Sequence, residues 1–417
     1  MRAQRWISPA VASALIVAAC SGGDPVPPDS TVATTTTLAP AERDSDGVLR
    51  LGALLPQSDT RIGSALLDSI TAAVADVNAA GGVLGNDVQL ITRNEGESTT
   101  AISDAVVALI DEGVDAIVGP SSSVTAVAAL DDTVRAGIVT CSPTASALTL
   151  DDYPDQRLFF RTIASDSLQA VAIADAAERT GRRDVAIVHV DDAYGRPYAA
   201  EVSAALQSRP LTQVTTIAIP VGDDDVDDDA FELASSGASV AIIVASPSDA
   251  ARFLTALGRQ EFESLSNIIL NDQVRDPATA AVIAGLPDLL RLRITGIAPQ
   301  ITVIDDTGGD DESPFAPFAP QATDCVHLVA LAAIQAGTDL PEAIASQMTS
   351  VSDGGTRCRT FETCATNLGE GRQIDYDGPT GRTELNREGE TVQAIFETFR
   401  FDESGTAVVV DRVPARL

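Results

Sequence analysis

Lysine is absent from this 417-residue chain, so all 27 of its basic residues are arginine. A Schiff-base lysine and the lysine of a phosphate-binding P-loop are therefore excluded. Aromatic residues make up only 4% of the chain, so any core must be built from aliphatic side chains. The 60 acidic residues give a net charge of −33, which argues against nucleic-acid binding because such proteins carry basic patches.

Catalytic motifs are also missing. The chain has two histidines, His189 in "VAIVHV" and His327 in an apolar segment, and both are expected to be core residues. There is no G-x-S-x-G, H-E-x-x-H or G-x-G-x-x-G motif, and a serine without a neighbouring base is not a nucleophile. The acidic run "DDDVDDD" lacks the glycine and spaced ligands of a calcium loop. We expect no catalytic residue, no metal and no cofactor.

The N-terminus has the pattern of an export signal. Arg2 and Arg5 precede a short apolar stretch that ends at Ala19, so residues 1–19 are interpreted as a signal peptide. The motif "VAAC" resembles a bacterial lipobox, in which Cys20 becomes the lipidated first residue; the alternative is an ordinary signal peptide with a chance cysteine. Residues 20–48 are rich in Ser, Thr, Pro and Gly and are predicted to be a disordered tether. These features predict a protein anchored to the outer face of the cell membrane.

Four cysteines follow Cys20, and an exported chain can oxidise them. Cys358 and Cys364 flank the short segment "CRTFETC" and are a possible disulfide. Cys141 and Cys325 are either a second pair or two buried thiols, and buried thiols are the favoured reading. No CxxC or Cys/His cluster suggests zinc.

Strand and helix patterns alternate from residue 49 onward. Apolar residues at helical spacing predict a helix over 61–82, followed by further strands and helices to residue 163. The pattern restarts with a helix at 166–181 and strands at 185–190, 214–219, 239–246 and 267–271. This predicts an α/β protein with two doubly wound parallel-sheet lobes joined by a hinge.

The C-terminal third is divided between these lobes. The strand at 292–298 is expected to return to the first lobe, and helices near 320–336 and 341–350 are expected to cover that lobe. Residues 391–401 and 407–413 alternate like a terminal β-hairpin. The predicted domains are therefore 49–163 plus 295–375 for lobe one, and 164–294 plus 376–417 for lobe two.

Hydroxyl residues follow two predicted strands of the first lobe. In open parallel sheets, ligands bind at the carboxyl ends of strands. In "VGPSSSVTAV" Ser122 and Ser123 stand at a helix N-terminus, where free N–H groups favour an anion. Helix capping alone explains one such serine. Thr144 and Ser146 lie in the loop after the next strand, which is otherwise a simple turn around Pro143.

Two strands of the second lobe also end in polar residues. Tyr194 follows "VAIVHV" and offers a ring with a hydroxyl, while Asp272 follows "NIIL" and can meet a cation. The alternative for Asp272 is an Asx turn without a ligand role.

Seven segments stand in an order and spacing that resembles the type I periplasmic-binding fold, and within it the leucine/isoleucine/valine-binding proteins of ABC importers. They are "LGALLPQSDTRIG", "AVADVNAAGGVLG", "DEGVDAIVGPSSS", "AGIVTCSPTASALT", "LFFRTIASDSLQA", "VAIVHVDDAYGR" and "IDYDGPTG". The likeness runs from about Leu49 to the C-terminus. It implies a monomeric lipoprotein that clamps an amino acid between two lobes and delivers it to ABC permease subunits. The alternative within this fold is a ligand-sensing receptor subunit that acts on a signalling partner.

The resemblance also implies residue roles. The ligand carboxylate would meet Ser123, the backbone of Thr144, and Ser146, while Asp272 would bind its ammonium group and Tyr194 would be the tyrosine of the family's Tyr-Gly pair. The chain departs from the family at Ile62, where the first loop often has a tyrosine, and at "ASPSDA", which lacks an aromatic contact. The predicted ligand is thus a branched-chain amino acid or a relative, an amide or a urea derivative.

Overall fold

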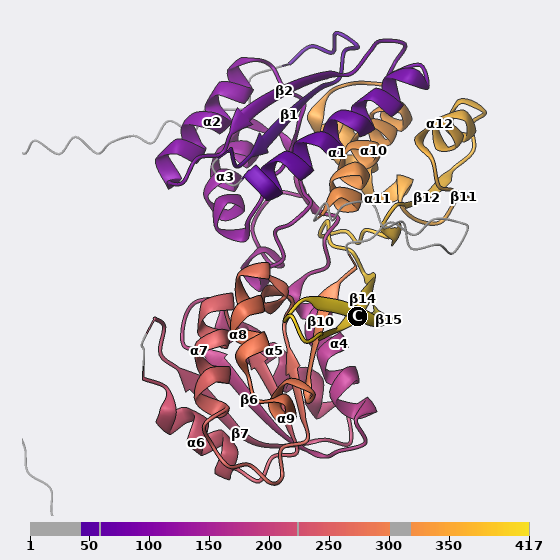
Figure 1. Cartoon of the computed structure of the whole chain (residues 1–417). Helices are drawn as coiled ribbons and strands as arrows, with labels where there is room; N and C mark the ends of the chain where they lie inside the picture. The colour runs from indigo at the N-terminus through magenta and orange to yellow at the C-terminus, as the bar shows by residue number, and fades with distance from the viewer. Residues whose placement is uncertain (1–42, 58–59, 223–224, 301–317, 417) are drawn as a thin grey trace, which may run out of the picture. The chain divides into compact units, whose positions relative to one another are not determined.

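The computed structural model describes residues 43–57, 60–222, 225–300 and 318–416. Two large sheets and one small sheet carry its strands, with helices packed against them (Figure 1). The predicted α/β fold class is confirmed.

The first large sheet is wholly parallel in the part of the chain that is described. Its order is β2 (Gln89–Asn94), β1 (Arg50–Leu55), β3 (Ala116–Val118), β4 (Val139–Ser142) and β5 (Phe159–Arg161). The connecting helices are α1 (Thr60–Ala79), α2 (Thr99–Asp111) and α3 (Ser123–Ala136), with the short η1 (Leu148–Leu150) before β5. The predicted helix at 61–82 is confirmed as α1, whose Leu66, Ile70 and Val77 are fully buried.

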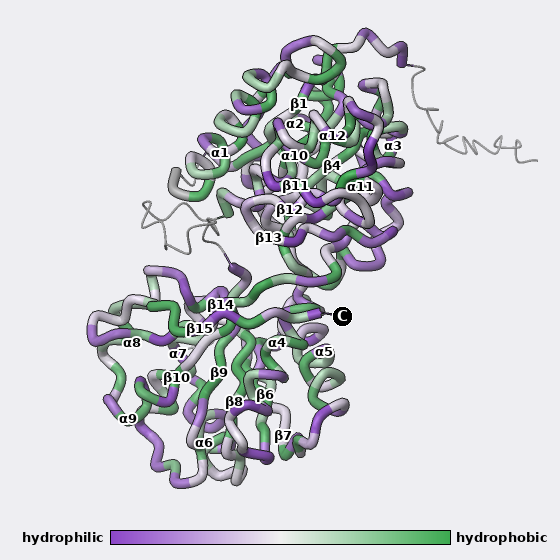
Figure 2. The backbone as a smooth tube through the Cα atoms, turned by 90° about the vertical axis from the view of Figure 1, so that its right-hand side faces the viewer, coloured by the Kyte–Doolittle hydropathy of each residue, from purple (hydrophilic) through white to green (hydrophobic). Residues whose placement is uncertain are grey.

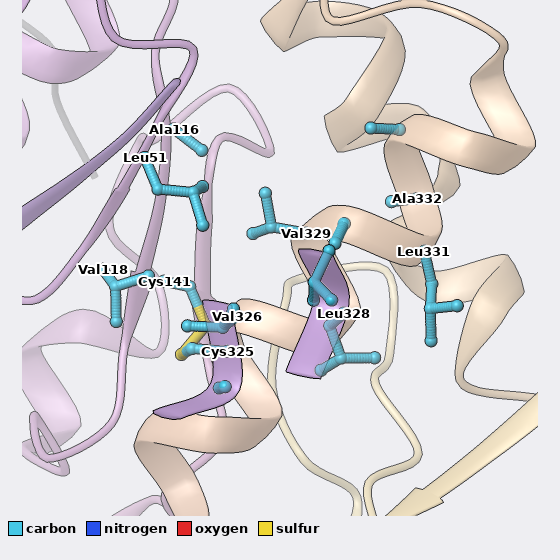
Figure 3. Packing of buried hydrophobic residues seen from close by; sticks show 14 of the residues in the cluster. Leu51, Ala116, Val118, Cys141, Cys325, Val326, Leu328, Val329, Leu331 and Ala332 are labelled. Atoms are coloured by element: carbon cyan, nitrogen blue, oxygen red, sulfur yellow. A yellow bond between two sulfur atoms is a disulfide. The ribbon is translucent and has the colours of Figure 1, made fainter. Parts of the chain in front are cut away.

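Two later helices complete the core of this sheet. They are α10 (Ala319–Ala336) and α11 (Pro341–Val351), and α10 packs along α1. Val326 and Val329 of α10 face Leu51 and Ala116 of the sheet (Figure 3). Helix α10 is apolar around most of its circumference because it is buried on nearly all sides.

The second large sheet has seven strands. Its order is β15 (Ala407–Arg416), β14 (Gln393–Phe401), β10 (Ile294–Pro299), β9 (Asn267–Leu270), β8 (Val240–Val244), β6 (Asp184–Val190) and β7 (Thr212–Ile219). β14 and β15 pair as an antiparallel hairpin, as predicted, and the other strands run parallel to one another. The apolar run "VAIIV" of β8 and the three residues "IIL" at the end of β9 fit central strands that are covered on both faces (Figure 2).

The helices of this half are α4 (Asp166–Arg179), α5 (Gly195–Gln207), α6 (Asp227–Ser235), α7 (Pro247–Leu257), α8 (Ala280–Gly285) and α9 (Asp288–Arg291), with the 3-10 turns η2 (Asp272–Arg275) and η3 (Pro277–Thr279). Part of the acidic run therefore opens α6, where three aspartates lie in the first turn and interact favourably with the helix dipole.

The expectation for the strand at 292–298 was wrong. This strand is β10, and it pairs with β9 and β14 in the second sheet rather than with the first. Only a short turn separates β10 from α9, a helix of the second half. The chain therefore stays in this half and pairs with β9, where Ile294 and Ile297 are fully buried. Conversely, Tyr376 and Leu385, which the predicted boundaries place in lobe two, pack in the core of the first sheet.

A small third sheet lies in the C-terminal third, in the order β11 (Thr356–Cys358), β12 (Ile374–Gly378) and β13 (Gly381–Arg382). Helix α12 (Phe361–Gly369) follows β11, and a disulfide joins Cys358 to Cys364 across this junction.

Cys141 and Cys325 are also joined by a disulfide, so the reading of two buried thiols was wrong (Figure 3). The bond links the end of β4 to α10, with 5.7 Å between the Cα atoms and a sequence separation of 184 residues. Both residues face the same core, which the local sequence around either cysteine does not reveal.

Among the described helices, no single one is long and apolar enough to cross a membrane. The bent pair α10 and α11 meets the criteria of length and composition, and α10 is mostly buried in the first core.

Candidate functional site

Three consecutive serines follow β3 and have different partners. The backbone N–H and the hydroxyl of Ser121 donate to the Glu95 carboxylate at 2.8 and 2.6 Å. The Ser122 hydroxyl caps α3 by accepting from the N–H of Thr125 at 3.1 Å, and it also bonds the Thr125 hydroxyl. The Ser123 hydroxyl accepts from the N–H of Ala147 at 3.1 Å. Of the three, Ser123 is therefore the one that reaches the neighbouring loop.

The loop after β4 is bonded to the serine loop. The Ser142 hydroxyl donates to the carbonyl of Pro120 at 2.8 Å and accepts from the N–H of Ala145 at 3.0 Å. The Thr144 hydroxyl donates to the same Pro120 carbonyl at 3.5 Å. The structure thus brings the loops of Ser123, Thr144 and Ser146 together at one edge of the first sheet, as the strand order predicts.

Some polar groups of these loops remain available. Within the described residues, the Ser123 hydroxyl proton has no acceptor, whereas the Ser122 hydroxyl is occupied by the helix cap. Glu95, which sequence reasoning missed, is only 3% exposed, and burial raises the pKa of its carboxyl. The sequence feature that could have identified Glu95 is its position directly after β2, at the same edge of the sheet as the serine loop.

Tyr194 and Asp272 are brought close together in the second half. Asp192 accepts from the N–H groups of Tyr194 and Gly195 at 2.9 and 2.6 Å and so orders the start of α5. The Tyr194 hydroxyl accepts from the side chain of Asn271, which directly precedes Asp272, at 3.2 Å. The Asp272 carboxylate accepts from the Gln169 amide of α4 at 3.1 Å.

Asp166, the first residue of α4, is a candidate that sequence reasoning missed. It is 2% exposed, and within the described residues its Oδ2 atom has no hydrogen-bond partner. Its backbone N–H donates to the carbonyl of Ser146 at 2.9 Å, which connects the two halves of the site. The signal was present in "IASDSLQA", an aspartate at a helix start just after the fifth parallel strand.

Asp166, Asp272 and Tyr194 form an acidic cluster. Burial raises the pKa of Asp166 well above its usual value, and the negative charge of Asp272 raises it further. Burial raises the pKa of Asp272 as well, and burial with the charges of Asp166 and Asp272 raises the pKa of Tyr194. Two buried carboxyls that repel each other are costly unless a proton or a cation compensates them.

The nearby cations are already engaged. Arg275, three residues after Asp272, donates to the buried Glu397 at 2.7 Å, and Arg161 bonds Glu390 and Asp151. The cluster is therefore suited to an ammonium group. On the other side, the Ser146 side chain bonds the Asp166 carboxyl, while the hydroxyl proton of Ser123 is suited to a carboxylate.

The remaining residues singled out in the sequence are the lipobox cysteine and the two histidines. Cys20, the signal peptide and most of the tether lie outside the described residues. His189 lies in β6 with its Nδ1 atom 2.9 Å from the carbonyl of Val190, and burial lowers the pKa of His327 in α10 to about 4. Within the described ranges, no group of three or more His, Cys, Asp and Glu side chains is arranged to hold a metal ion.

Two doubly wound sheets whose strand ends carry polar loops define the architecture of a two-lobed solute-binding protein. The family model described as "Periplasmic binding protein" matches residues 49–287, which is more than half of the chain. The chain belongs to this family. It is a binding protein and not an enzyme.

Two proteins similar to this chain have different named roles, one in amino acid binding and one in chemotactic signalling. The chain is 30% identical over 170 residues to Leu/Ile/Val-binding protein homolog 3 of Brucella melitensis, which covers 40% of this chain and 46% of that protein. It is 27% identical over 361 residues to the chemotactic signal transduction system substrate-binding protein BasB of Halobacterium salinarum, covering 80% of this chain and 83% of that protein. The match thus spans less than half of the length of the Brucella protein.

A solved structure shares the fold. The branched-chain amino acid transporter substrate-binding protein LivJ of Streptococcus pneumoniae, solved in complex with isoleucine, superposes with a TM-score of 0.64 at 19% identity. The match covers 89% of this chain and 100% of LivJ. At this identity the likeness shows the fold.

Proposed function

We propose that this protein is an extracytoplasmic solute-binding lipoprotein of an ABC importer. Its ligand is a small amino acid-like molecule, a branched-chain amino acid or a relative, an amide or a urea derivative. Lobes built on the two large sheets close on the ligand, and the closed form is the one that the permease subunits recognise.

One observation carries the proposal: the carbonyl of Ser146 accepts from the N–H of Asp166 at 2.9 Å. This contact sets a loop with neutral hydroxyl and N–H donors beside a pair of buried carboxyls, Asp166 and Asp272. An α-amino acid carries its carboxylate and its ammonium group on the same carbon atom, so neighbouring loops can contact both groups. The arrangement therefore supports recognition of both groups at once.

Each predicted residue has a role in this proposal. Ser123 and Ser146 donate to the carboxylate, Thr144 contributes its backbone, and Ser122 orders the helix N-terminus whose N–H groups face the anion. Asp272 and Asp166 bind the ammonium group. Tyr194, held by Asn271, covers the bound ligand on the second lobe.

A ligand panel tests the proposal. The purified protein is expected to gain thermal stability from at least one of the twenty amino acids, their amides or urea, because a ligand that binds only the native state raises Tm. Stabilisation by none of these compounds would contradict the proposed ligand class.

The lipid anchor is a separate part of the proposal, and the pattern "VAAC" supports it. In a bacterial host the full chain is expected in the membrane fraction, and Cys20→Ser is expected in the soluble fraction. Equal membrane association of both proteins would refute the anchor at Cys20.

A second function, ligand sensing for a signalling partner, is favoured by the similarity to BasB, which extends over 80% of this chain. Co-purification with permease subunits from the native membrane supports import, whereas co-purification with a transducer supports sensing.

A further inference from the structure

A single arginine joins the loop of Ser146 to two other segments. Arg161 ends β5 and is fully buried. Its Nε atom donates to both oxygens of Glu390 at 2.9 and 2.7 Å, and one terminal nitrogen donates to Asp151 at 2.5 Å. The other terminal nitrogen donates to the carbonyls of Ala145 and Ala147, at 3.2 Å each.

These two carbonyls stand on either side of Ser146. The carbonyl of Ser146 itself accepts from the N–H of Asp166, and the N–H of Ala147 donates to the Ser123 hydroxyl. Residues 145–147 are therefore held from three sides, by Arg161, by Asp166 and by Ser123.

The partners of Arg161 extend this network to both halves of the proposed site. Asp151 also accepts from the hydroxyl of Ser165, at 2.8 Å, and the Ser165 hydroxyl caps the start of α4 just before Asp166. On the other side, the N–H of Arg161 donates to the carbonyl of Gly389, next to Glu390. One guanidinium thus contacts the Ser146 loop directly and the start of α4 through Asp151.

The two carbonyl contacts satisfy the donors of the second terminal nitrogen, which a fully buried guanidinium cannot leave unpaired, and they also fix the positions of both carbonyls. The planar guanidinium supplies several donors in a fixed geometry, which a compact ammonium group cannot reproduce. The carbonyl contacts therefore add an orienting role to charge neutralisation.

We infer that Arg161 is a positioning residue of the ligand site, which holds Ser146 in place for the ligand carboxylate through the carbonyls of Ala145 and Ala147. This inference rests on the proposed function, because it assigns a role in binding the same ligand.

The test compares Arg161→Lys with a matched variant, Arg209→Lys. Arg209 is a largely buried arginine that bonds Asp175 at 2.8 Å and the carbonyls of Val171 and Ala205, and no predicted site residue is among these partners. The probe is the panel compound that most stabilises the wild type. Calorimetric titration is expected to give a Kd at least tenfold higher for Arg161→Lys and within twofold of the wild type for Arg209→Lys.

Hydrogen exchange distinguishes a local change in the Ser146 loop from a general loss of stability, because the two change the exchange rates of different amides. The amide of Ala147 is expected to exchange faster in Arg161→Lys, while amides in the buried part of α10 keep their wild-type protection. If Arg161→Lys does not fold, Asp151→Asn takes its place, with Asp175→Asn as its control and an expected Kd increase of at least threefold.

The outcomes separate the two ideas. Absence of wild-type binding to every panel compound overturns the proposed function. Wild-type binding together with an unchanged Kd in the folded variant, Arg161→Lys or its replacement Asp151→Asn, overturns the positioning role alone.

Discussion

At the scale of single residues, the carboxylate side of the proposed site relies on neutral donors. Ser123 and Ser146 stand on two loops that are joined through Pro120 and Ala147. Hydroxyl and N–H groups can hold a carboxylate without the bidentate grip of an arginine, and a protein that passes on its ligand must also release it.

The double variant Ser123→Ala, Ser146→Ala tests these hydroxyls. A hydrogen bond to a charged group contributes about 1.5–3 kcal/mol, so the Kd is expected to rise by roughly tenfold or more. Titration calorimetry measures it, with Ser69→Ala, Ser236→Ala as the control because neither hydroxyl contacts a predicted site residue. The Ser69 hydroxyl bonds the carbonyl of Ala65, and the Ser236 hydroxyl bonds the carbonyl of Leu233 and the N–H of Ala238. An unchanged Kd in the site variant would show that these residues only form turns.

Asp166 should make ligand affinity depend on pH. Its raised pKa means that the protonated form persists to higher pH, and only the ionised form attracts an ammonium group strongly. Affinity is therefore expected to increase as the pH is raised from 5 to 8, and Asp166→Asn should bind more weakly at pH 8 with a flatter profile. Identical profiles for the variant and the wild type would remove Asp166 from the site.

At the scale of elements, local patterns predicted the two sheets well and the long-range assignments poorly. The face of α1 and the hairpin of β14 and β15 follow from side-chain periodicity. β10 was assigned to the wrong sheet because its apolar run suits a central position in either one. Asp166 was missed because the end of β5 was not read as a ligand-facing edge.

The two disulfides allow a matched comparison. Removing a crosslink raises the entropy of the unfolded chain, and the effect grows with the loop that the bond closes. The Cys141–Cys325 bond spans 184 residues and the Cys358–Cys364 bond spans 6.

Urea unfolding is expected to show a loss of about 5 kcal/mol for Cys141→Ser, Cys325→Ser and about 2 kcal/mol for Cys358→Ser, Cys364→Ser, by the chain-entropy relation. The opposite ranking would show that local packing, rather than loop closure, sets the contribution of each bond.

At the scale of the whole molecule, buried acids should make the unliganded protein less stable as the pH rises. Burial raises the pKa of Asp115, Asp324 and Glu390 to about 7. The native state therefore binds more protons than the unfolded chain between the ordinary carboxyl pKa and about 7, so stability is lost as the pH rises through this range.

Calorimetric scans of the ligand-free protein are thus expected to give a higher Tm at pH 5 than at pH 8, and Asp324→Asn should reduce the difference. A Tm that increases from pH 5 to pH 8 would contradict the assignment of these buried carboxyls.

The family is shown by the match over residues 49–287, whereas the ligand is inferred from the site. The most direct test is calorimetric titration of the wild type with leucine, with its 2-oxo acid, which lacks the ammonium group, and with 3-methylbutylamine, which lacks the carboxylate. Leucine is expected to bind, and each truncated compound is expected to bind at least a hundredfold more weakly. Binding of either truncated compound as tightly as leucine, or no binding of leucine, would contradict recognition of both groups at this site.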